Sequence, residues 1–193
     1  MVQLADAMLP TRSAKLIVLD RDGVINYDSD EYIKSPAEWR PIPGSIEAIA
    51  RLNQNGFRIA IASNQSGIGR GLFDMATLNA INDKMMELVF RQGGRIDAVF
   101  FCPHTAVENC GCRKPRTGLL EEIAARFHAE LKGVPFVGDS LKDLQCAEAV
   151  GAQPILVLTG KGKATKEEGA LPRKTLVFPD LAEASRHLIA HPA

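Results

Sequence analysis

Short apolar segments alternate with amphipathic segments along most of this chain, which strongly limits the folds open to it. The first apolar segment, Leu16–Leu19, is a continuous run typical of a strand that is covered on both faces. Six strands are predicted in all, at residues 16–19, 57–62, 96–101, 134–137, 154–158 and 175–178. Strands separated by helices pair in parallel through right-handed crossovers. The sequence therefore predicts a three-layer, Rossmann-like α/β fold with a mainly parallel sheet.

The intervening segments have the apolar spacing of helices. Helices are predicted at residues 44–53, 75–92, 118–129, 141–149 and 181–190. Asn55 and Gly56 are expected to end the first of them, and Asp74 is the expected cap of the second. The glycines and lysines of residues 160–172 favour a loop there.

Size and charge indicate one domain and exclude several kinds of partner. A chain of 193 residues is most simply one domain, here residues 15–193, with Met1–Ala14 as a partly ordered extension. The 23 acidic and 23 basic residues balance, which argues against nucleic acid or an anionic membrane as the main partner. No apolar run approaches the roughly 20 residues that span a membrane, and the N-terminus lacks the pattern of a signal peptide. A cytoplasmic protein is expected, and a monomer.

Four polar stretches lie at or beyond predicted strand ends and supply the groups for phosphate chemistry. They are Asp20-Arg-Asp-Gly23, Ser63-Asn-Gln65, Arg113-Lys-Pro115 and Gly138-Asp-Ser140. In parallel sheets, ligands bind beyond the carboxyl ends of the strands. The four stretches are therefore expected to meet at one rim of the sheet, although each has a simpler structural interpretation when it is taken alone.

The two aspartates after the first strand could carry covalent catalysis. Asp20 could attack phosphorus once Mg²⁺ screens the substrate's charge, which would give an aspartyl-phosphate. Asp22 could protonate the leaving oxygen and then deprotonate the hydrolytic water. For the first of these steps it must be protonated, so nearby negative charge is expected to raise its pKa. The alternative for Asp-x-Asp-Gly is a simple turn, for which Gly23 is also suited.

The other three stretches could bind the phosphoryl group and the metal. The hydroxyl of Ser63 and neighbouring backbone N–H groups could hold phosphoryl oxygens, although Ser is also a common helix cap. Lys114 could offset transition-state charge and Arg113 could grip a second phosphate; a solvated basic pair is the alternative. Asp139 is the expected second carboxylate on Mg²⁺, with Asp20 and the backbone carbonyl of Asp22. Ser140-x-x-Asp143 is better interpreted as a capping box.

A dense group of cysteines and one histidine follows the third predicted strand. Cys102-Pro-His104 and Cys110-Gly-Cys112 offer three thiolates and one imidazole, which suits tetrahedral Zn²⁺. Four protein ligands leave no open position, so a structural zinc is predicted in this cysteine–histidine loop, residues 102–112. Three free thiols and a surface histidine are the alternative. Cys146 stands apart on a predicted helix and is expected to be a small buried apolar residue.

The motifs resemble those of the haloacid dehalogenase (HAD) superfamily of phosphatases. Leu19-Asp-Arg-Asp-Gly-Val-Ile-Asn26 is similar to the first motif, with its Asp-x-Asp signature, and Gly138-Asp-Ser-Leu-Lys-Asp143 to the fourth. Ser63 and Lys114 fit the second and third motifs, so the resemblance extends from Lys15 to about Gly160. It implies a HAD-like fold. Since no insertion separates the motifs, no large cap domain is expected.

Within this superfamily, the cysteine–histidine loop resembles that of a small group of heptose bisphosphate and histidinol phosphate phosphatases. Substrate-binding roles are expected for Asp28, Glu31, Ser63, Asn64, Gln65, Arg70, Arg113 and Lys114. The first two motifs look more like the heptose enzymes, which implies a small sugar bisphosphate substrate and a role in lipopolysaccharide synthesis. The short zinc spacer is more typical of histidinol phosphatases, and Ser140 replaces a lysine of some heptose enzymes. A phosphomutase and a non-catalytic zinc-stabilised binding module are further alternatives.

Overall fold

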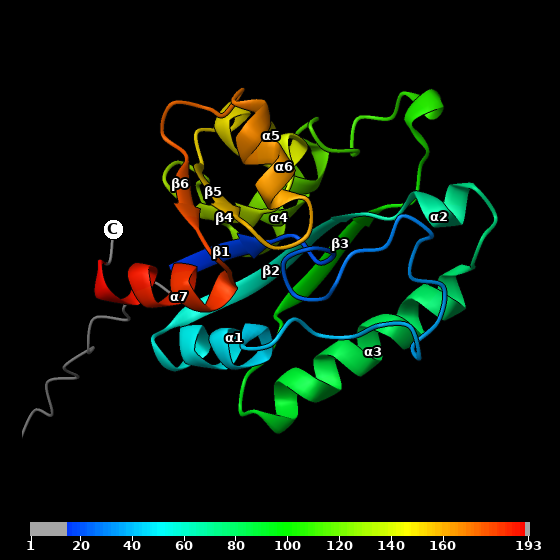
Figure 1. Cartoon of the computed structure of the whole chain (residues 1–193), viewed down its shortest axis with the longest axis horizontal. Coiled ribbons are helices and arrows are strands. Elements are labelled where there is room, and N and C mark those ends of the chain that lie inside the picture. Colours follow the sequence, from blue (N-terminus) through cyan, green and yellow to red (C-terminus); the bar gives the residue numbers. More distant parts are fainter. Residues whose placement is uncertain (1–14, 192–193) are drawn as a thin grey trace, which may run out of the picture.

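The computed structural model describes residues 15–191, which are built around one six-stranded sheet (Figure 1). All neighbouring strands are parallel, in the order β3-β2-β1-β4-β5-β6. The strands are β1 (Lys15–Leu19), β2 (Phe57–Asn64), β3 (Ala98–Cys102), β4 (Pro135–Gly138), β5 (Gln153–Val157) and β6 (Leu176–Phe178). Every predicted strand is present, with ends shifted by at most two residues. The predicted extension, residues 1–14, lies outside the described residues.

Five longer helices match the prediction and form the outer layers. They are α1 (Ser45–Gln54), α3 (Met75–Arg91), α4 (Gly118–Phe127), α5 (Leu141–Ala149) and α7 (Leu181–Ala190). The Asp74 side chain accepts a hydrogen bond from the backbone N–H of Thr77 and so caps α3, as expected. None of the helices in the described part of the chain is long and apolar enough to cross a membrane.

The loop expected at residues 160–172 is a wrong prediction, because α6 (Gly162–Glu168) occupies much of it. This helix is held by tertiary contacts that no local sequence pattern predicts. The Thr165 hydroxyl donates to the backbone carbonyl of Asp139 at 2.9 Å. Gly162 lies so close to the carbonyl of Val157 that a Cβ would be 1.8 Å from that oxygen. A shorter helix, α2 (Ser66–Gly69), and a 3₁₀ turn, η1 (Ala106–Glu108), lie in segments for which no helix was predicted.

The core is divided by the sheet into two apolar clusters. Alternate residues of β1 point to opposite faces, so Ile17 and Leu19 enter one cluster while Leu16 and Val18 enter the other. Helices α1, α3 and α7 contribute to the first cluster and α4 and α5 to the second. Cys146 is fully buried in the second, as predicted. This arrangement confirms the three-layer α/β fold.

The segment between β1 and α1, residues 20–44, crosses the carboxyl rim of the sheet without forming a separate domain. Its regular pairing is limited to isolated bridges of Asn26 with Asp22 and Pro41. Trp39 is completely buried and anchors the segment in the first apolar cluster. Within the described residues no cap domain covers the rim, so the site below is open to small substrates.

Candidate active site

The polar stretches meet where β1, β2 and β4 end, at one rim of the sheet. Leu19 pairs with Ile61 of β2 and with Val137 of β4, so Asp20 lies between Ser63 and Asp139. These residues line a cavity of about 600 Å³. Nine predicted site residues contribute to its lining: Asp20, Asp22, Asp28, Ser63, Asn64, Gln65, Arg113, Lys114 and Asp139. A second cavity, of about 610 Å³, lies near the opposite rim around Lys15 and Phe57 and holds none of them.

Two predicted substrate-binding residues are not part of this lining. Glu31 and Arg70 are both exposed and contribute no atoms to the wall of the cavity. Arg70 follows α2, whose helical turn places it away from the rim residues Ser63 and Gln65. Roles for Glu31 and Arg70 therefore remain predictions without support from this geometry.

Lys114 lies at the centre of the charged network and is almost completely buried. Its Nζ is 3.0 Å from Asp20 Oδ1 and 2.6 Å from Asp143 Oδ1, and it donates a hydrogen bond to the carbonyl of Ala62 at 2.7 Å. Burial opposes the charged form, but Asp143 and Asp20 more than offset it and raise the pKa of Lys114. The ammonium is therefore fixed in place and charged. A solvated basic pair, the alternative interpretation of Arg113-Lys114, is excluded for Lys114.

Three buried carboxylates surround the same point. One oxygen from each of Asp20, Asp139 and Asp143 lies within 4.8 Å of the others. Burial raises the pKa of Asp139 to about 7, and the Asp143 charge adds to this effect. Burial also raises the pKa of Asp20, although Lys114 opposes the rise. Three carboxylates against one ammonium leave two negative charges uncompensated, so the oxygen-rich set fits a divalent cation such as Mg²⁺.

Asp143 has two structural roles, and only the capping box was predicted from the sequence. It forms the expected capping box with Ser140, whose backbone N–H donates to Asp143 Oδ2 at 3.1 Å. Its other oxygen forms the ion pair with Lys114. Asp143 is thus both the cap of α5 and a member of the carboxylate cluster.

The expectation that nearby negative charge raises the pKa of Asp22 is wrong for this structure. Burial does raise it, but the Arg21 guanidinium and hydrogen bonds from Asn26 and Gln65 outweigh burial, and the pKa is lowered. The Arg21 Nη2 lies 3.1 Å from Asp22 Oδ2, and the Asn26 and Gln65 amides donate at 2.9 and 2.7 Å. Asp22 is consequently a well-held, ionised carboxylate that faces the cavity.

Arg21 was missed in the sequence, although it stands between the two aspartates. Charged residues in a turn are normally exposed, yet this side chain is buried and its Nη1 donates to Asn82 of α3 at 3.3 Å. The backbone N–H of Arg21 also donates to Asp20 Oδ1 at 2.7 Å. Arg21 thereby orients both aspartates and ties them to α3.

The Ser63-Asn-Gln65 stretch positions groups from two other stretches. The Gln65 amide donates to both Asp22 Oδ2 and Ser63 Oγ, at 2.7 and 2.8 Å. The Asn64 side chain makes two hydrogen bonds, both of 3.1 Å, with the backbone N–H and carbonyl of Lys114. Asn64 therefore positions Lys114, a role different from the substrate contact expected for it. Ser63 is not a helix cap, because α2 begins three residues later with Gln65 at its cap position.

Asp139 is held by a turn that the sequence did not identify. Its Oδ2 accepts a hydrogen bond from the backbone N–H of Lys161 at 2.8 Å. Gly23 and Gly160 both have positive φ, and a Cβ on either would lie 2.0 or 2.1 Å from the same oxygen. Both glycines are therefore required by a conformation and a contact that only glycine tolerates. Gly23 was expected at a sharp turn; Gly160 and Lys161 were not expected near the site.

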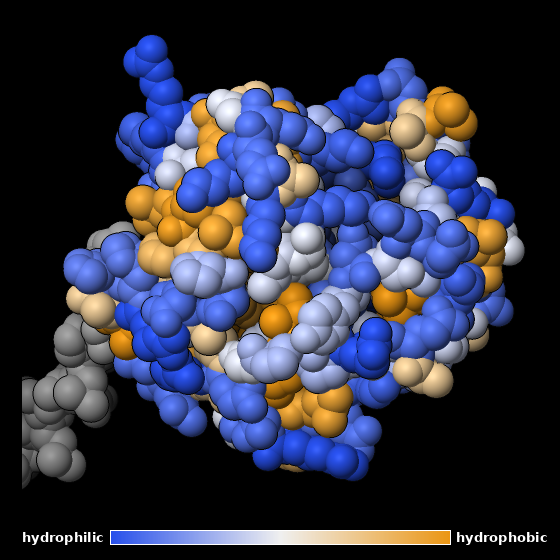
Figure 2. Space-filling model, viewed as in Figure 1, coloured by the Kyte–Doolittle hydropathy of each residue, from blue (hydrophilic) through white to orange (hydrophobic). Residues whose placement is uncertain are grey.

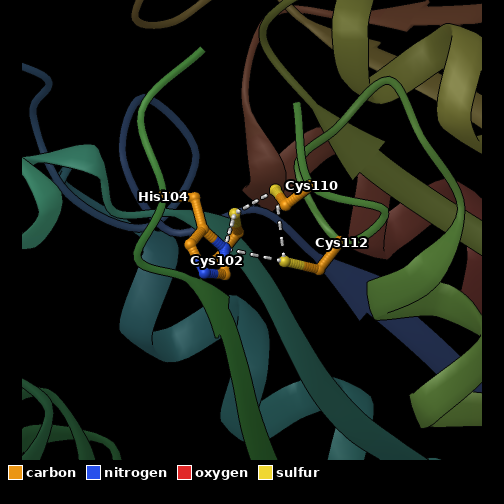
Figure 3. Close-up of side chains that lie close together, drawn as sticks. All are labelled: Cys102, His104, Cys110 and Cys112. Atoms are coloured by element: carbon orange, nitrogen blue, oxygen red, sulfur yellow. Dashed lines mark hydrogen bonds between the residues drawn. The ribbon is translucent and has the colours of Figure 1, made fainter. Parts of the chain in front are cut away.

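The cysteine–histidine loop brings its four predicted ligands together, as Figure 3 shows. The distances from Cys102 Sγ to His104 Nδ1, from Cys102 to Cys110, from Cys110 to Cys112 and from Cys112 to His104 are between 3.3 and 3.6 Å. Two sulfur ligands of one tetrahedral Zn²⁺ lie about 3.8 Å apart, given a Zn–S bond of about 2.3 Å. The spacing and the donor set both fit zinc.

The face of the molecule in Figure 2 is mostly polar. On the face shown in Figure 2, apolar side chains form separate patches among hydrophilic ones. The most exposed large apolar residues are Val107, at the tip of the cysteine–histidine loop, and Phe90 of α3. The monomeric state stays a prediction.

Comparison with known proteins agrees with this geometry. A HAD-hydrolase-like family model matches residues 111–184. The D-glycero-beta-D-manno-heptose-1,7-bisphosphate 7-phosphatase of Pseudomonas putida is 55% identical over 175 residues, which are 91% of this chain and 99% of that protein. The chain belongs to this family of HAD-like phosphatases. Members of the family are phosphoric monoester hydrolases, and the chain is an enzyme of that class.

Two further members of the heptose bisphosphate phosphatase family are from Bordetella bronchiseptica and Pseudomonas aeruginosa, at 53% and 51% identity over 91% and 92% of this chain. The crystal structure of the B. bronchiseptica enzyme, complexed with magnesium and phosphate, superposes with a TM-score of 0.90. It covers 91% of this chain, and 98% of that chain is matched. The family, its fold and its hydrolase class thus confirm the resemblance found in the motifs.

Proposed function

We propose that the chain hydrolyses the 7-phosphate of D-glycero-β-D-manno-heptose 1,7-bisphosphate, in the cytoplasmic synthesis of nucleotide-activated heptose for lipopolysaccharide. The observation that carries the proposal is the convergence of Asp20, Asp22, Ser63, Lys114 and Asp139 on one cavity. The choice of sugar rests on relatives of 50–55% identity that carry this substrate in their names. These relatives outweigh the short zinc spacer, which had favoured a histidinol phosphatase.

The residues at the rim have distinct parts in the reaction. Asp20, Asp139 and the backbone carbonyl of Asp22 would hold Mg²⁺, which when bound neutralises phosphoryl oxygens and so permits an anionic nucleophile to approach. Lys114, fixed between Asp20 and Asp143, adds a positive charge beside the transferring group. The Ser63 hydroxyl, oriented by Gln65, donates to a phosphoryl oxygen.

Asp20 attacks phosphorus, forming an aspartyl-phosphate as the bond from phosphorus to the sugar oxygen breaks. Asp22 gives its proton to the departing sugar oxygen and afterwards takes a proton from water, which attacks phosphorus and releases phosphate. Arg21 lowers the pKa of Asp22 in the free protein, so the carboxylate form suits the second step. For the first step Asp22 has to gain a proton when the anionic substrate arrives beside it.

A side-by-side assay tests the proposed substrate. Purified protein with Mg²⁺ is offered the β and α anomers of the heptose bisphosphate, heptose 7-phosphate and histidinol phosphate, and phosphate release is measured. The kcat/KM for the β anomer is expected to be about 100-fold or more above that for histidinol phosphate. A substrate that leaves buried polar groups of the site without partners is strongly disfavoured. Isomerised sugar phosphate without released phosphate would point to a phosphomutase. Equal or faster release from histidinol phosphate would overturn the choice of sugar.

A structural zinc in the cysteine–histidine loop is the second part of the proposal. Cys112 directly precedes Arg113, and the Arg113 guanidinium donates to the carbonyl of His104 at 3.2 Å. A metal that clamps Cys110 and Cys112 would thus fix the backbone from which Arg113 and Lys114 project. We therefore expect the ion to act on phosphate recognition from outside the reaction centre.

Removal of zinc by a chelator, with Mg²⁺ restored, is expected to raise KM or lower kcat by about tenfold or more, since a misplacement of about 1 Å in a positioning group can cost about 100-fold. Metal content is measured by elemental analysis and folding by circular dichroism. Cys146→Ser serves as the matched control, because it removes a thiol outside the zinc set. Full activity in a folded protein shown to be free of zinc would contradict the coupling.

A further inference from the structure

The turn between β5 and α6 connects the floor of the active site to its mouth through one residue, Lys161. At the floor, the backbone N–H of Lys161 donates to Asp139 Oδ2 at 2.8 Å. At the mouth, its Nζ lies 3.1 Å from Asp28 Oδ2 and 3.9 Å from Asp30 Oδ1. The backbone and the side chain of Lys161 therefore contact different parts of the cavity.

The backbone of this turn is fixed while the Lys161 side chain is free to move. Gly160 lies against Asp139 and Gly23 with no space for a Cβ, and the Thr159 hydroxyl donates to the carbonyl of Gly23 at 2.6 Å. The Lys161 side chain, in contrast, is 59% exposed. An ion pair at this exposure is weak, so the ammonium can exchange one partner for another at little cost.

Four positively charged side chains line the cavity. They are Arg113, Lys114, Lys142 and Lys161. Lys114 is engaged by Asp20 and Asp143, beside the group that is transferred. The Asp28 carboxylate at the mouth would repel a second phosphate unless a cation neutralised either the carboxylate or that phosphate. Lys161 is the cation in contact with Asp28.

The strand order places Lys161 and Arg113 on opposite sides of the nucleophile. Arg113 follows the loop from β3, at one end of the sheet, and Lys161 follows β5, towards the other end. Asp20 follows β1, between them. A substrate whose reacting phosphate lies at Asp20 can therefore meet a cation on either side.

We propose that Lys161 is a specificity-determining residue that pairs with Asp28 in the free protein and with the second, non-transferred phosphate in the bisphosphate complex. A phosphate carries more negative charge than one carboxylate and attracts the ammonium more strongly. The exchange leaves Asp28 free to accept hydrogen bonds from sugar hydroxyls. This inference rests on the proposed function, because it requires a substrate with two phosphates.

Lys161→Met tests it, since this change keeps the backbone N–H that holds Asp139 and removes only the charge. We expect kcat/KM for the heptose 1,7-bisphosphate to fall about 10- to 100-fold, the size of one lost charge-assisted hydrogen bond, mainly through KM. With heptose 7-phosphate, the loss is expected to stay below about threefold, because that substrate lacks the second phosphate. Because Arg113 lies on the other side of Asp20, a selective loss in Arg113→Ala without one in Lys161→Met would place the second phosphate at Arg113 instead. Lys163 is an exposed lysine two residues on, outside the lining of the cavity. Lys163→Met should therefore leave kcat/KM for both substrates unchanged.

Several results would overturn the inference. Equal losses with both substrates would mean that Lys161 acts on Asp139 or on the transferred phosphate. No loss with either, or a selective loss in Lys142→Met alone, would assign the second phosphate to another group. If the wild-type protein showed no preference for the bisphosphate over the monophosphate, the proposed function itself would fail, which distinguishes the two failures.

Discussion

Asp20→Asn is expected to lower kcat by about 10⁴-fold or more, because the amide cannot form the bond to phosphorus that the carboxylate forms. The substitution keeps the shape of the side chain, and its oxygen can still accept the N–H of Arg21, which donates to Asp20 Oδ1 at 2.7 Å. Phosphate release from the heptose bisphosphate measures the effect. Turnover at the wild-type level would contradict a nucleophilic role for Asp20.

Stability distinguishes this loss of chemistry from a loss of structure. Burial and the neighbouring carboxylates raise the pKa of Asp20 in the folded protein. A raised carboxylate pKa means that ionisation at neutral pH opposes folding, so the neutral amide relieves this opposition. In the absence of Mg²⁺, the free energy of unfolding of Asp20→Asn is therefore expected to equal or exceed that of the wild type in urea. An inactive variant that is also destabilised would leave misfolding as the cause.

Lys114→Met is expected to have the second largest effect, on activity and on stability together. Its ammonium is almost fully buried between Asp20 and Asp143, so its removal leaves two carboxylates without their cation. Breaking a buried ion pair from one side costs about 3–5 kcal/mol of unfolding free energy. Loss of the charge beside the transferring group is expected to lower kcat about 10²- to 10³-fold. Urea unfolding and phosphate release measure the two effects.

The double variant Lys114→Met/Asp143→Asn separates the two effects. The Asp143→Asn change removes one of the unpaired charges, and the oxygen of the new amide can still accept the Ser140 N–H of the capping box. Part of the lost stability should return while the activity stays low. If Lys114→Met alone unfolded like the wild type, the buried network would not be a source of stability, and its central position in the site would be in doubt.

The strands and the four motifs were predictable because their signals are local. A continuous apolar run such as Leu16–Leu19 is recognisable without knowledge of its neighbours, and parallel pairing then places the residues that follow each strand at one rim. Asp20, Ser63 and Asp139 were found in this way. The ligands of the cysteine–histidine loop were equally accessible, because few structures apart from a metal site require four soft or borderline donors within 11 residues.

The remaining features depend on contacts between distant parts of the chain. Helix α6 begins among glycines and lysines and is held by Thr165 and the backbone of Asp139, which no local pattern reveals. The lowered pKa of Asp22 depends on Gln65, 43 residues away, as well as on the burial of Arg21. The role of Asn64 in holding Lys114 joins residues 50 positions apart. The positioning roles of Asn64 and Gln65 were therefore missed although both residues were predicted as site residues, while Arg21 was not predicted at all.

Rapid-quench trapping tests the central claim most directly. Enzyme with Mg²⁺ is mixed with heptose bisphosphate labelled in its 7-phosphate, quenched in acid within milliseconds, digested and mapped. We expect label on the peptide that contains Asp20, lost on treatment with hydroxylamine as an acyl phosphate should be, and absent in Asp20→Asn. Label on a different residue, or rapid turnover with no labelled protein at any time point, would contradict the covalent mechanism.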